Sequence, residues 1–356
     1  MESERALETI ELGPPGGDVR ILDQTLLPFQ VQYRTLVDWE GAAEAIKMMR
    51  VRGAPLIGAA AACGMALAIR ADSSDSFMFK AADGLRETRP TAVNLQWAVE
   101  RCLSILACTK PEDRLEVAWK EAAAIIAEDK AANTAIGEYG APLIKALSES
   151  IDGEPVRILT HCNAGWLATT HLGTATAPVY LAHAQGIPVH VLVDETRPRG
   201  QGAALTAWEL ERAGVPCDVI ADNAGGLLMQ RGEVHMVITG ADRVAANGDV
   251  CNKIGTYLKA LAARESGVPF CVSVPTSTID PAMPDGYGIP IEDRGPDEVL
   301  HATGIDPEGT VRTIRIAPEG VSAQNPAFDI TPADMVSTLI TERGLIKPEH
   351  AGRVVA

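Results

Sequence analysis

The second half of the chain repeats one pattern, in which a short apolar segment ends in polar residues and is followed by a segment with helical spacing. Five such segments lie at residues 156–160, 189–193, 217–220, 235–239 and 270–274. Strands that alternate with helices pair in parallel and build a doubly wound α/β sheet, and ligands bind at the carboxyl ends of its strands. We therefore expect a Rossmann-like parallel sheet with a functional site at that edge. We also expect a final helix over residues 332–341.

The first half of the chain has a different pattern. Residues 18–28 and 31–37 have the alternation of two strands in a small antiparallel sheet. Helical spacing of apolar residues then recurs at 39–49, 56–68, 77–87, 94–106 and 112–147. The turn residues Asp-Gly-Glu-Pro at 152–155 mark the change between the two patterns. We expect two domains: a mainly helical one with a small sheet at 1–150, and a Rossmann-like catalytic one at 151–356.

The charge of the chain excludes several classes of function. The formal net charge is −16 and the sequence pI is about 4.9, so neither nucleic acid nor an anionic membrane is an expected partner. No apolar run reaches the roughly 18 residues that span a bilayer, and the acidic N-terminus is unlike a signal peptide, so we expect a cytoplasmic protein. An anionic ligand must then be held by a few well-placed basic residues.

Motifs for metals and cofactors are missing from the sequence. The seven cysteines are odd in number and include no C-x-x-C pair, which argues against a disulfide framework and a structural zinc site. The histidines have no metal-binding spacing. Neither G-x-G-x-x-G after a strand nor G-x-x-x-x-G-K-[ST] occurs, so the sheet gives no reason to expect a dinucleotide or a nucleoside triphosphate. We expect no metal and no cofactor.

Two strand ends carry residues that could do chemistry. The first strand runs into His161, Cys162 and Asn163, and a segment with helical spacing opens at Trp166; the fourth strand is followed by Asp242. A thiol near a helix N-terminus is favoured as the thiolate. A lone cysteine is more often a core residue, and an aspartate at a strand end more often caps a turn, but the two together at one sheet edge form a more specific signal. We expect His161 to orient the turn.

A few polar and basic residues have unusual positions. Arg52 precedes a helix rich in alanine and glycine, where it could clamp a phosphate together with free helix amides. Arg89 lies in a proline-containing connection, and Gln201 follows the second strand of the sheet. Asn252 and Lys253 are expected to begin a helix after a glycine-containing turn, where a lysine opposes the helix dipole. Taken singly, Arg52 and Arg89 are more often solvated side chains, Gln201 fits either interpretation, and the position of Lys253 hints at ligand binding.

Eight sequence blocks that span nearly the whole chain resemble the S-methyl-5-thioribose-1-phosphate isomerase family of methionine salvage. They are RGAPLIG (52–58), TRPTAVNL (88–95), ILTHCNAG (158–165), DETRP (194–198), QGAALTAWEL (201–210), GADRVAANGDVCNKIGTY (240–257), IPIEDRGPDEV (289–299) and NPAFDITP (325–332). The resemblance implies a small N-terminal helical domain with a three-stranded sheet, a Rossmann-like domain and a homodimer. It also implies a phosphosugar substrate, an aldose 1-phosphate that is converted to the ketose.

The resemblance further assigns roles to individual residues. It implies that Cys162 and Asp242 are the catalytic pair. It implies that the phosphosugar is held by Arg52, Gly53, Ala54, Arg89, Gln201, Asn252 and Lys253.

The substrate of this family has a phosphate on its anomeric oxygen, so the sugar ring cannot open through a free hydroxyl and its ring oxygen must be protonated. Asp242 could be the general acid if burial keeps its carboxyl protonated. Hydrogen must then move from C2 to C1. Cys162 could carry it as a proton, or the site could favour a direct hydride shift, and the sequence leaves both routes open.

The sequence also departs from the family pattern. The family commonly has apolar residues after DETRP and an arginine in QGARLTAWEL, where this chain has Arg199-Gly200 and Ala204. A basic residue after ETRP resembles relatives that isomerise ribose 1,5-bisphosphate. Isomerases of that sugar or of 5-deoxyribose 1-phosphate are therefore alternatives. We expect Arg199 to point away from the sugar or to pair with a strand-end carboxylate.

An alternative from a different class is a non-catalytic binding protein. The family is related to regulatory subunits of the translation initiation exchange factor, which share the fold. The presence of both Cys162 and Asp242 favours the enzyme.

Overall fold

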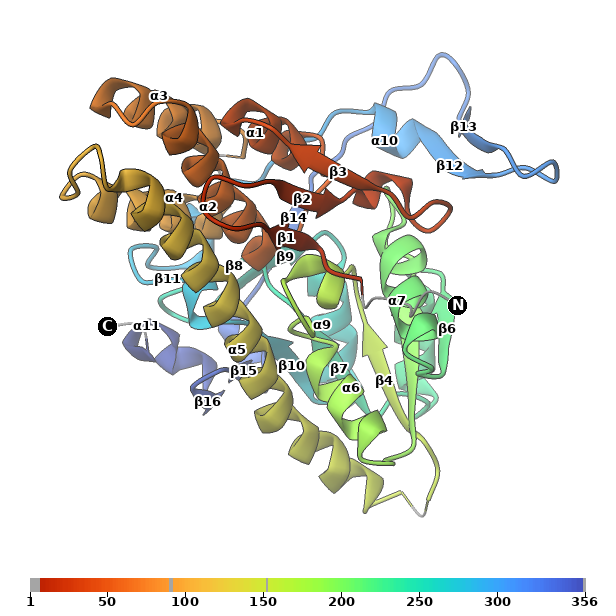
Figure 1. The fold of residues 1–356 in the computed structure, drawn as a ribbon. Coiled ribbons are helices and arrows are strands. Elements are labelled where there is room, and N and C mark those ends of the chain that lie inside the picture. The colour runs from red at the N-terminus through yellow and green to blue at the C-terminus, as the bar shows by residue number, and fades with distance from the viewer. Residues whose placement is uncertain (1–6, 90–91, 152, 355–356) are drawn as a thin grey trace, which may run out of the picture.

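The computed structural model describes residues 7–89, 92–151 and 153–354 (Figure 1). A seven-stranded sheet forms its centre, in the order β16-β15-β10-β7-β4-β5-β6. Six strands run parallel and β16 is antiparallel at the edge. The bounds are β4 (Val156–Thr160), β5 (Val189–Asp194), β6 (Cys217–Ile220), β7 (Met236–Thr239), β10 (Phe270–Ser273), β15 (Thr338–Thr341) and β16 (Gly344–Ile346). The five expected strands and the parallel sheet are confirmed.

The helix expected over 332–341 is wrong. The segment forms one 3₁₀ turn, Ala333–Met335, and then strand β15. Leu339 and Ile340 are neighbours in sequence, yet they are buried in the hydrophobic clusters on opposite sides of the sheet. Apolar residues that fit a helical period here instead fill both faces of a buried strand, which sequence spacing alone does not distinguish.

Helices cover both faces of the sheet. Ile158 packs into one cluster with α6 (Ala177–Ala184) and the C-terminal half of α5 (Arg114–Ser148). The next residue, Leu159, packs into the other cluster with α8 (Ala224–Gln230) and α9 (Thr256–Glu265). Alternate side chains of a strand point to opposite faces, so both faces are apolar and both are covered.

The strand order reverses at β4. From β4 the chain adds β5 and β6 on one side, whereas β7, β10 and β15 lie on the other side. In open α/β sheets such a reversal opens a crevice at the carboxyl ends of the strands, because the two neighbouring connections leave in opposite directions. Cys162 follows β4 and Asp242 follows β7, so the two residues stand at this reversal.

The N-terminal part is built from helices and a three-stranded antiparallel sheet of β1 (Ile10–Leu12), β2 (Val19–Leu22) and β3 (Tyr33–Leu36). The sheet confirms the two strands expected from the sequence and the third strand implied by the resemblance. The helices are α1 (Trp39–Lys47), α2 (Ala54–Ala71), α3 (Asp75–Arg86), α4 (Val93–Leu106) and α5.

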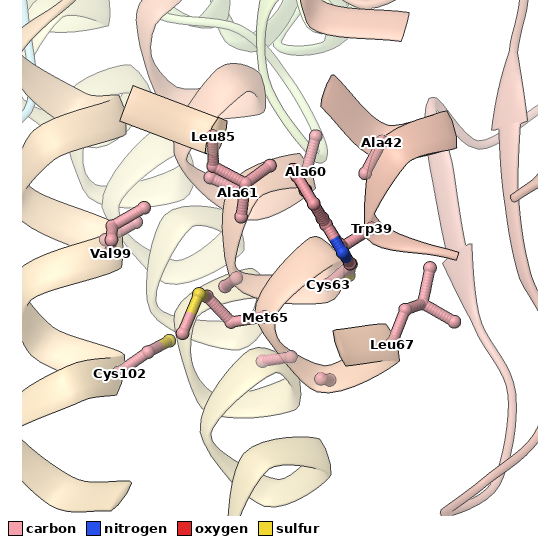
Figure 2. Close-up of a cluster of buried hydrophobic side chains, with 14 of the residues drawn as sticks. Trp39, Ala42, Ala60, Ala61, Cys63, Met65, Leu67, Leu85, Val99 and Cys102 are labelled. Carbon is pink, nitrogen blue, oxygen red and sulfur yellow. The ribbon is translucent and has the colours of Figure 1, made fainter. Parts of the chain in front are cut away.

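Helix α2 is the centre of this part. Figure 2 shows Ala60, Ala61 and Met65 of α2 beside Leu85 of α3 and Val99 of α4. Its small side chains let the surrounding helices approach closely. Among the described residues, α2 is also the one helix that is long and apolar enough to cross a membrane, but 89% of that stretch is buried inside the protein, as expected of a core helix.

Helix α5 contributes to two hydrophobic cores. Trp119 and Ile125 pack with α2, whereas Ile136 and Ile144 pack against the large sheet. The segment expected as one helix or a helix pair is a single helix of 35 residues, and it contains Pro142. Because α5 belongs to both cores, it ties the helical part to the sheet, and the domain boundary at residue 150 stays a prediction.

A second, four-stranded sheet delivers residues to the site. Its order is β11-β8-β9-β14, with β8 (Arg243–Ala245), β9 (Val250–Lys253), β11 (Ile279–Asp280) and β14 (Phe328–Thr331). Asn252 and Lys253 were expected at a helix start, but they lie in β9, where Lys253 pairs with Phe328. Helix α9 begins later, after Gly255 with its left-handed φ of 103°. Gly255 separates strand β9 from helix α9. The expected helix start at Asn252 and Lys253 is therefore wrong, because both residues lie in the strand before the helix.

The remaining elements lie around the edge of the sheet. A π-helical turn at Gly202–Thr206 leads into α7 (Ala207–Arg212). Helix α10 (Asp297–Leu300) leads into the hairpin of β12 (His301–Ile305) and β13 (Val311–Arg315), which projects from the body of the molecule (Figure 1). The last element of the described residues is α11 (Ala351–Val354).

Candidate active site

One pocket at the strand-order reversal gathers the residues selected from the sequence. Every predicted site residue except Arg89 lines it: Arg52, Gly53, Ala54, Cys162, Gln201, Asp242, Asn252 and Lys253. Arg89 lines a smaller adjoining cavity, which shares Ala54 and Asp242 with the main pocket. Segments that are up to two hundred residues apart therefore meet at one point of the fold.

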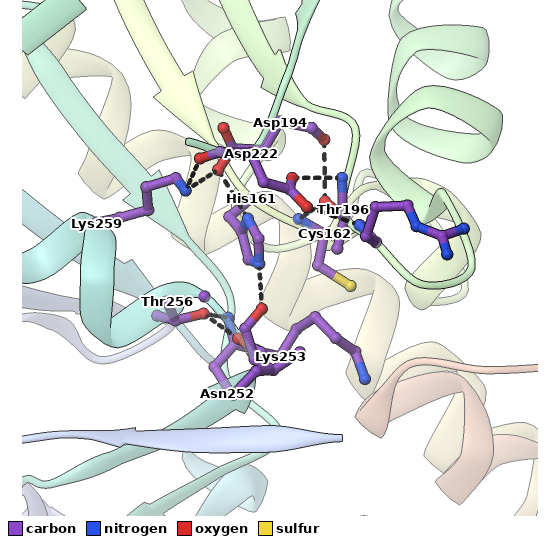
Figure 3. A network of polar contacts seen from close by, with 12 residues as sticks. His161, Cys162, Asp194, Thr196, Asp222, Asn252, Lys253, Thr256 and Lys259 are labelled. Carbon is purple, nitrogen blue, oxygen red and sulfur yellow. Dashed lines mark hydrogen bonds and ion pairs between the residues drawn. The ribbon is translucent and has the colours of Figure 1, made fainter. Parts of the chain in front are cut away.

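Cys162 is held in a conformation that non-glycine residues rarely adopt. Its φ is 65°, in the left-handed region. Two threonine hydroxyls fix its backbone. The N–H donates to Thr196 Oγ1 at 2.8 Å (Figure 3), and the carbonyl accepts from Thr206 Oγ1 at 2.7 Å. The thiol donates to Gln201 Oε1 at 3.5 Å. Strain of this kind persists where the surroundings over-determine the conformation, and here it aims the sulfur into the pocket.

The expected helix directly after Cys162 is wrong. Trp166–Ala168 forms one 3₁₀ turn, and the next helix, α6, begins only at Ala177. The tight packing of this loop explains the difference, because a Cβ at Gly165 would lie 1.9 Å from a carboxylate oxygen of Glu209. Positive charge near the sulfur comes instead from Arg52 and Lys253, which both interact electrostatically with the thiol.

His161 is fully engaged in structural bonds. Its Nδ1 lies 2.7 Å from Asp194 Oδ2 and its Nε2 lies 2.8 Å from the carbonyl oxygen of Ile254 (Figure 3). With both ring nitrogens occupied, the side chain ties β4 to the end of β5 and to the loop after β9. This arrangement agrees with the expected role of orienting the turn.

The potential metal ligands of His161, Asp194 and Asp222 lie within 4.8 Å of one another. The ammonium group of Lys259 already lies among them, 3.0 Å from Asp194 Oδ2 and bonded to the Asp222 carbonyl. An ammonium in this place supplies the positive charge that a metal ion would otherwise bring.

Arg52 is buried at the start of α2, with 7% of its surface exposed. Its guanidinium donates to the side-chain oxygen of Asn163 and, at 2.6 Å, to the Asn163 carbonyl. Burial lowers its pKa, against the opposing effect of the nearby Cys162 and Asp242. The next residue, Gly53, has a φ of 92°, and a Cβ there would lie 2.5 Å from Ala168, so only glycine fits.

Lys253 lies beside Arg294, a residue that the sequence analysis did not single out. Lys253 Nζ is 4.6 Å from the centre of the Phe328 ring and the Arg294 guanidinium carbon is 5.5 Å from it. Burial, reinforced by the charge of Arg294, lowers the pKa of Lys253 to about 8. Lys253 Nζ also donates to the Ala327 carbonyl at 2.8 Å.

Glu292 connects Arg294 to Arg89. Its carboxylate contacts Arg294 Nε at 3.1 Å and Arg89 Nη2 at 3.3 Å. The two arginines hold the pKa of Glu292 below its usual range despite its burial. Glu292 and Arg294 both belong to the block IPIEDRGPDEV, so the signal was present in the sequence. Nothing in the spacing of that block showed that this loop returns to the pocket.

Asp242 follows β7 and is half-buried. Its backbone N–H donates to the Cys251 carbonyl at 2.9 Å, which fixes the turn. Arg52, Arg89 and Lys253 all interact electrostatically with its carboxylate. The surroundings of Asp242 are therefore cationic.

A groove continues from the pocket beyond Met49 and Gln201. Apolar side chains, including Leu27 and Leu205, form part of its lining, and Arg199 lies along it. Arg199 Nη1 contacts Glu298 Oε1 of α10 at 3.0 Å. The expected pairing with a carboxylate is therefore present, but the partner lies on a helix and not at a strand end.

This arrangement combines a thiol, a carboxylate and four buried cations around one small cavity. The cations are Arg52, Arg89 and Lys253, which are each less than 10% exposed, and Arg294, whose side chain is 7% exposed. Such a cavity can bind a compact dianion and perform proton transfers beside it.

Comparison with known proteins places this site in a family. Residues 50–348 match the Initiation factor 2 subunit family. The chain is 58% identical to the methylthioribose-1-phosphate isomerase of Acidiphilium cryptum over 328 residues, which cover 92% of this chain and 89% of the relative. It is 55% identical to the protein of the same name from Rhodospirillum centenum over 345 residues, 97% of this chain and 92% of that protein.

Solved structures agree with the sequence relatives. The crystal structure of 5-methylthioribose 1-phosphate isomerase from Pyrococcus horikoshii superposes with a TM-score of 0.83 at 41% identity, covering 98% of this chain and 94% of that one. A structure described as translation initiation factor eIF-2B, subunit delta, from A. fulgidus has a TM-score of 0.78 at 39% identity, covering 96% of each chain. With its fold, its pocket and this degree of identity, the chain belongs to the methylthioribose-1-phosphate isomerase family.

Proposed function

We propose that this protein is an aldose–ketose isomerase that converts S-methyl-5-thio-α-D-ribose 1-phosphate to S-methyl-5-thio-D-ribulose 1-phosphate in methionine salvage. The observation that carries the proposal is the meeting of Cys162 and Asp242 in one cationic pocket. The two residues come from the strands that flank the strand-order reversal, and the residues around them have the charge that a phosphosugar requires.

The phosphate binds among the buried cations. Arg52 and Lys253 line the main pocket together with Arg294, and the N-terminus of the 18-residue helix α2 opens there at Ala54. Charge-assisted hydrogen bonds and helix amides are the contacts that phosphate prefers in proteins. Gln201 and Asn252 contribute polar groups for the sugar hydroxyls.

Asp242 acts as the general acid in ring opening. It protonates the ring oxygen, the bond from C1 to that oxygen breaks, and the positive charge at C1 is shared with the phosphoryl-bearing oxygen. Arg52, Arg89 and Lys253 interact electrostatically with the Asp242 side chain, and a bound phosphate dianion would offset the same three cations.

Cys162 then carries the hydrogen. Acting as the thiolate beside Arg52 and Lys253, it removes the proton from C2 and gives an enol phosphate. The thiol exchanges its proton with solvent and then donates a proton to C1, and the O2 hydroxyl loses its proton to the Asp242 carboxylate, which leaves the ketone at C2. Both residues end the cycle in their starting states. A direct hydride shift would leave no solvent deuterium at C1 of the product, which distinguishes the two routes.

The group at carbon five faces the groove. Leu27 and Leu205 offer apolar contacts for a methylthio group, and Glu298 already pairs with Arg199. A second phosphate would need a free cation at this end of the sugar. These features favour methylthioribose 1-phosphate over ribose 1,5-bisphosphate.

Steady-state kinetics on three sugars side by side test the proposal. The sugars are methylthioribose 1-phosphate, 5-deoxyribose 1-phosphate and ribose 1,5-bisphosphate, and we expect the first to have the highest kcat/KM. A preference of about 10-fold or more for the bisphosphate would show that the substrate is wrong while the chemistry is right. Absence of turnover on all three, together with tight binding to a protein partner, would favour the non-catalytic function instead.

We also propose a homodimer that works in the cytoplasm. The projecting hairpin β12–β13 exposes apolar side chains, with Ile314 58% and Ile305 54% exposed, and such residues are common at interfaces between subunits. The net charge of −16 argues against nucleic acid and anionic membranes as partners. Light scattering tests the dimer, which should have about twice the chain mass of 37.6 kDa.

A further inference from the structure

A buried carboxyl lies directly behind the pocket and takes no part in the proposed chemistry. Glu209 of α7 has no exposed surface. The loop after Cys162 is built around it: the Asn163 side-chain amide donates to Oε1, and the Leu167 N–H lies 3.4 Å from Oε2. Gly165 leaves room for the carboxylate, since a Cβ there would overlap it.

Asn163 connects this carboxylate to Arg52. The two ends of its amide have opposite roles: Nδ2 donates to Glu209 and, at 3.1 Å, to Thr206 Oγ1, whereas Oδ1 accepts from the Arg52 guanidinium. Both partners of Nδ2 are acceptors, so they fix which end faces Arg52. A reversed amide would place its NH₂ against the guanidinium and lose all three of these bonds.

We propose that Glu209 is a positioning residue, which orients the Asn163 amide so that Arg52 is held in place for the phosphate of the substrate. The inference rests on the proposed function, because it gives Arg52 the task of binding that phosphate. It assigns to a buried residue of the QGAALTAWEL block a role that does not require contact with the sugar.

The charges around Glu209 make this role dependent on pH. Burial raises the pKa of Glu209 to about 7, against the lowering effects of the Asn163 amide, the Trp166 and Leu167 N–H groups and the charge of Arg52. Tyr180 of α6 faces the same carboxyl, and its own pKa is raised by burial and by Glu209. As the pH falls through about 7, Glu209 gains a proton and becomes a weaker acceptor for Asn163, so Arg52 is held less well.

The test compares Glu209→Gln with Glu211→Gln, the same substitution at an exposed position of the same helix. Glutamine keeps the shape, but it places an NH₂ group against either the Asn163 amide or the Leu167 N–H. We expect KM for methylthioribose 1-phosphate to rise about 10-fold with kcat within about 3-fold, which corresponds to about 1.4 kcal/mol of lost binding. Glu211→Gln should leave both constants unchanged. Glu209→Asp, which keeps the charge but withdraws it from Asn163, should also raise KM.

Two further measurements separate positioning from general damage. In an Asn163→Ala background, Glu209→Gln should have no further effect on KM, because the connecting amide is gone. The rise of KM below pH 7 should be larger in the parent than in Glu209→Gln; the substrate phosphate titrates in both proteins, so the difference isolates Glu209.

An unchanged KM in Glu209→Gln or Glu209→Asp, an undiminished effect in the Asn163→Ala background, or identical pH profiles would each overturn the inference. These outcomes are distinct from failure of the proposed function, in which the parent protein itself would not turn over the sugar.

Discussion

Replacing Lys253 by methionine should make the protein more stable at pH 7 while weakening phosphate binding. Lys253 is 5% exposed, and its pKa is lowered from 10.5 to about 8 because burial disfavours its charged form. At pH 7 the Lys253 side chain is charged, and this charge is less favourable in the folded protein than in the unfolded chain. Methionine has a similar length and no charge to bury.

The magnitude follows from the pKa of Lys253. A depression of 2.5 units corresponds to about 3 kcal/mol at about 1.4 kcal/mol per unit. Methionine also loses the bond to the Ala327 carbonyl, which costs about 1 to 2 kcal/mol for an unpaired buried acceptor. We expect Lys253→Met to raise the free energy of unfolding at pH 7 by about 1 to 2 kcal/mol.

The sign of the pH dependence gives a sharper test. Between pH 8 and 10.5 the unfolded chain holds the Lys253 proton and the folded parent releases it, so the parent gains stability relative to the variant as the pH rises. The advantage of Lys253→Met should shrink from about pH 8, vanish at about pH 9 and be reversed by pH 10.5. Denaturant unfolding of both proteins at several pH values measures the difference, and Lys120→Met, at an exposed position on α5, is the control.

A variant that is less stable than the parent at pH 7, or a difference that does not change with pH, would refute this account of Lys253. The accompanying rise in KM would show that the buried charge is retained for binding and not for the fold.

Three other substitutions test the site. Asp242→Asn should lower kcat by at least about 10²-fold in the isomerase assay while the phosphosugar still binds, because the amide has no proton to transfer; a kcat within a few-fold of the parent would contradict the assignment. Cys162→Ser should also lower kcat by about 10²-fold or more, and mass spectrometry of product formed by the parent in D₂O should find deuterium at C1 if the proton route operates. Arg199→Leu should leave kcat/KM on methylthioribose 1-phosphate nearly unchanged, since its partner is Glu298; loss of activity would place this arginine on the sugar.

Much of the central sheet could be predicted because its strands are short apolar segments separated by helices. The same reasoning failed at Asn252 and Lys253, which lie in a strand, and at residues 332–341, which form a 3₁₀ turn and a strand instead of a helix. Leu339 and Ile340 show why: a strand buried on both faces has no alternation, so its apolar residues can equally fit a helix. Its identity depends on pairing with β10, which lies some sixty residues earlier in the chain.

The meeting of Cys162 and Asp242 was predictable for a topological reason. Residues that follow neighbouring parallel strands must share one edge of the sheet, so their proximity needs no knowledge of side-chain packing. Arg294 has no such constraint, because it lies in an irregular connection whose return to the pocket depends on the Phe328 ring and on Glu292. The sequence pattern also does not predict that Glu209 is buried, since a glutamate in a helix is usually solvated.

The distribution of charge around the pocket connects the fold with the proposed chemistry. In a chain of net charge −16, four cations are buried around one cavity, and in the free protein they face the carboxylates of Asp242 and Glu292. Burial is the main cause of the lowered pKa of Lys253, and the charge of Arg294 adds to it. A phosphate dianion would offset the repulsion between these cations. The proposed phosphate site and the proposed general acid therefore share the same few residues, so the loss of one cation is expected to affect both binding and turnover.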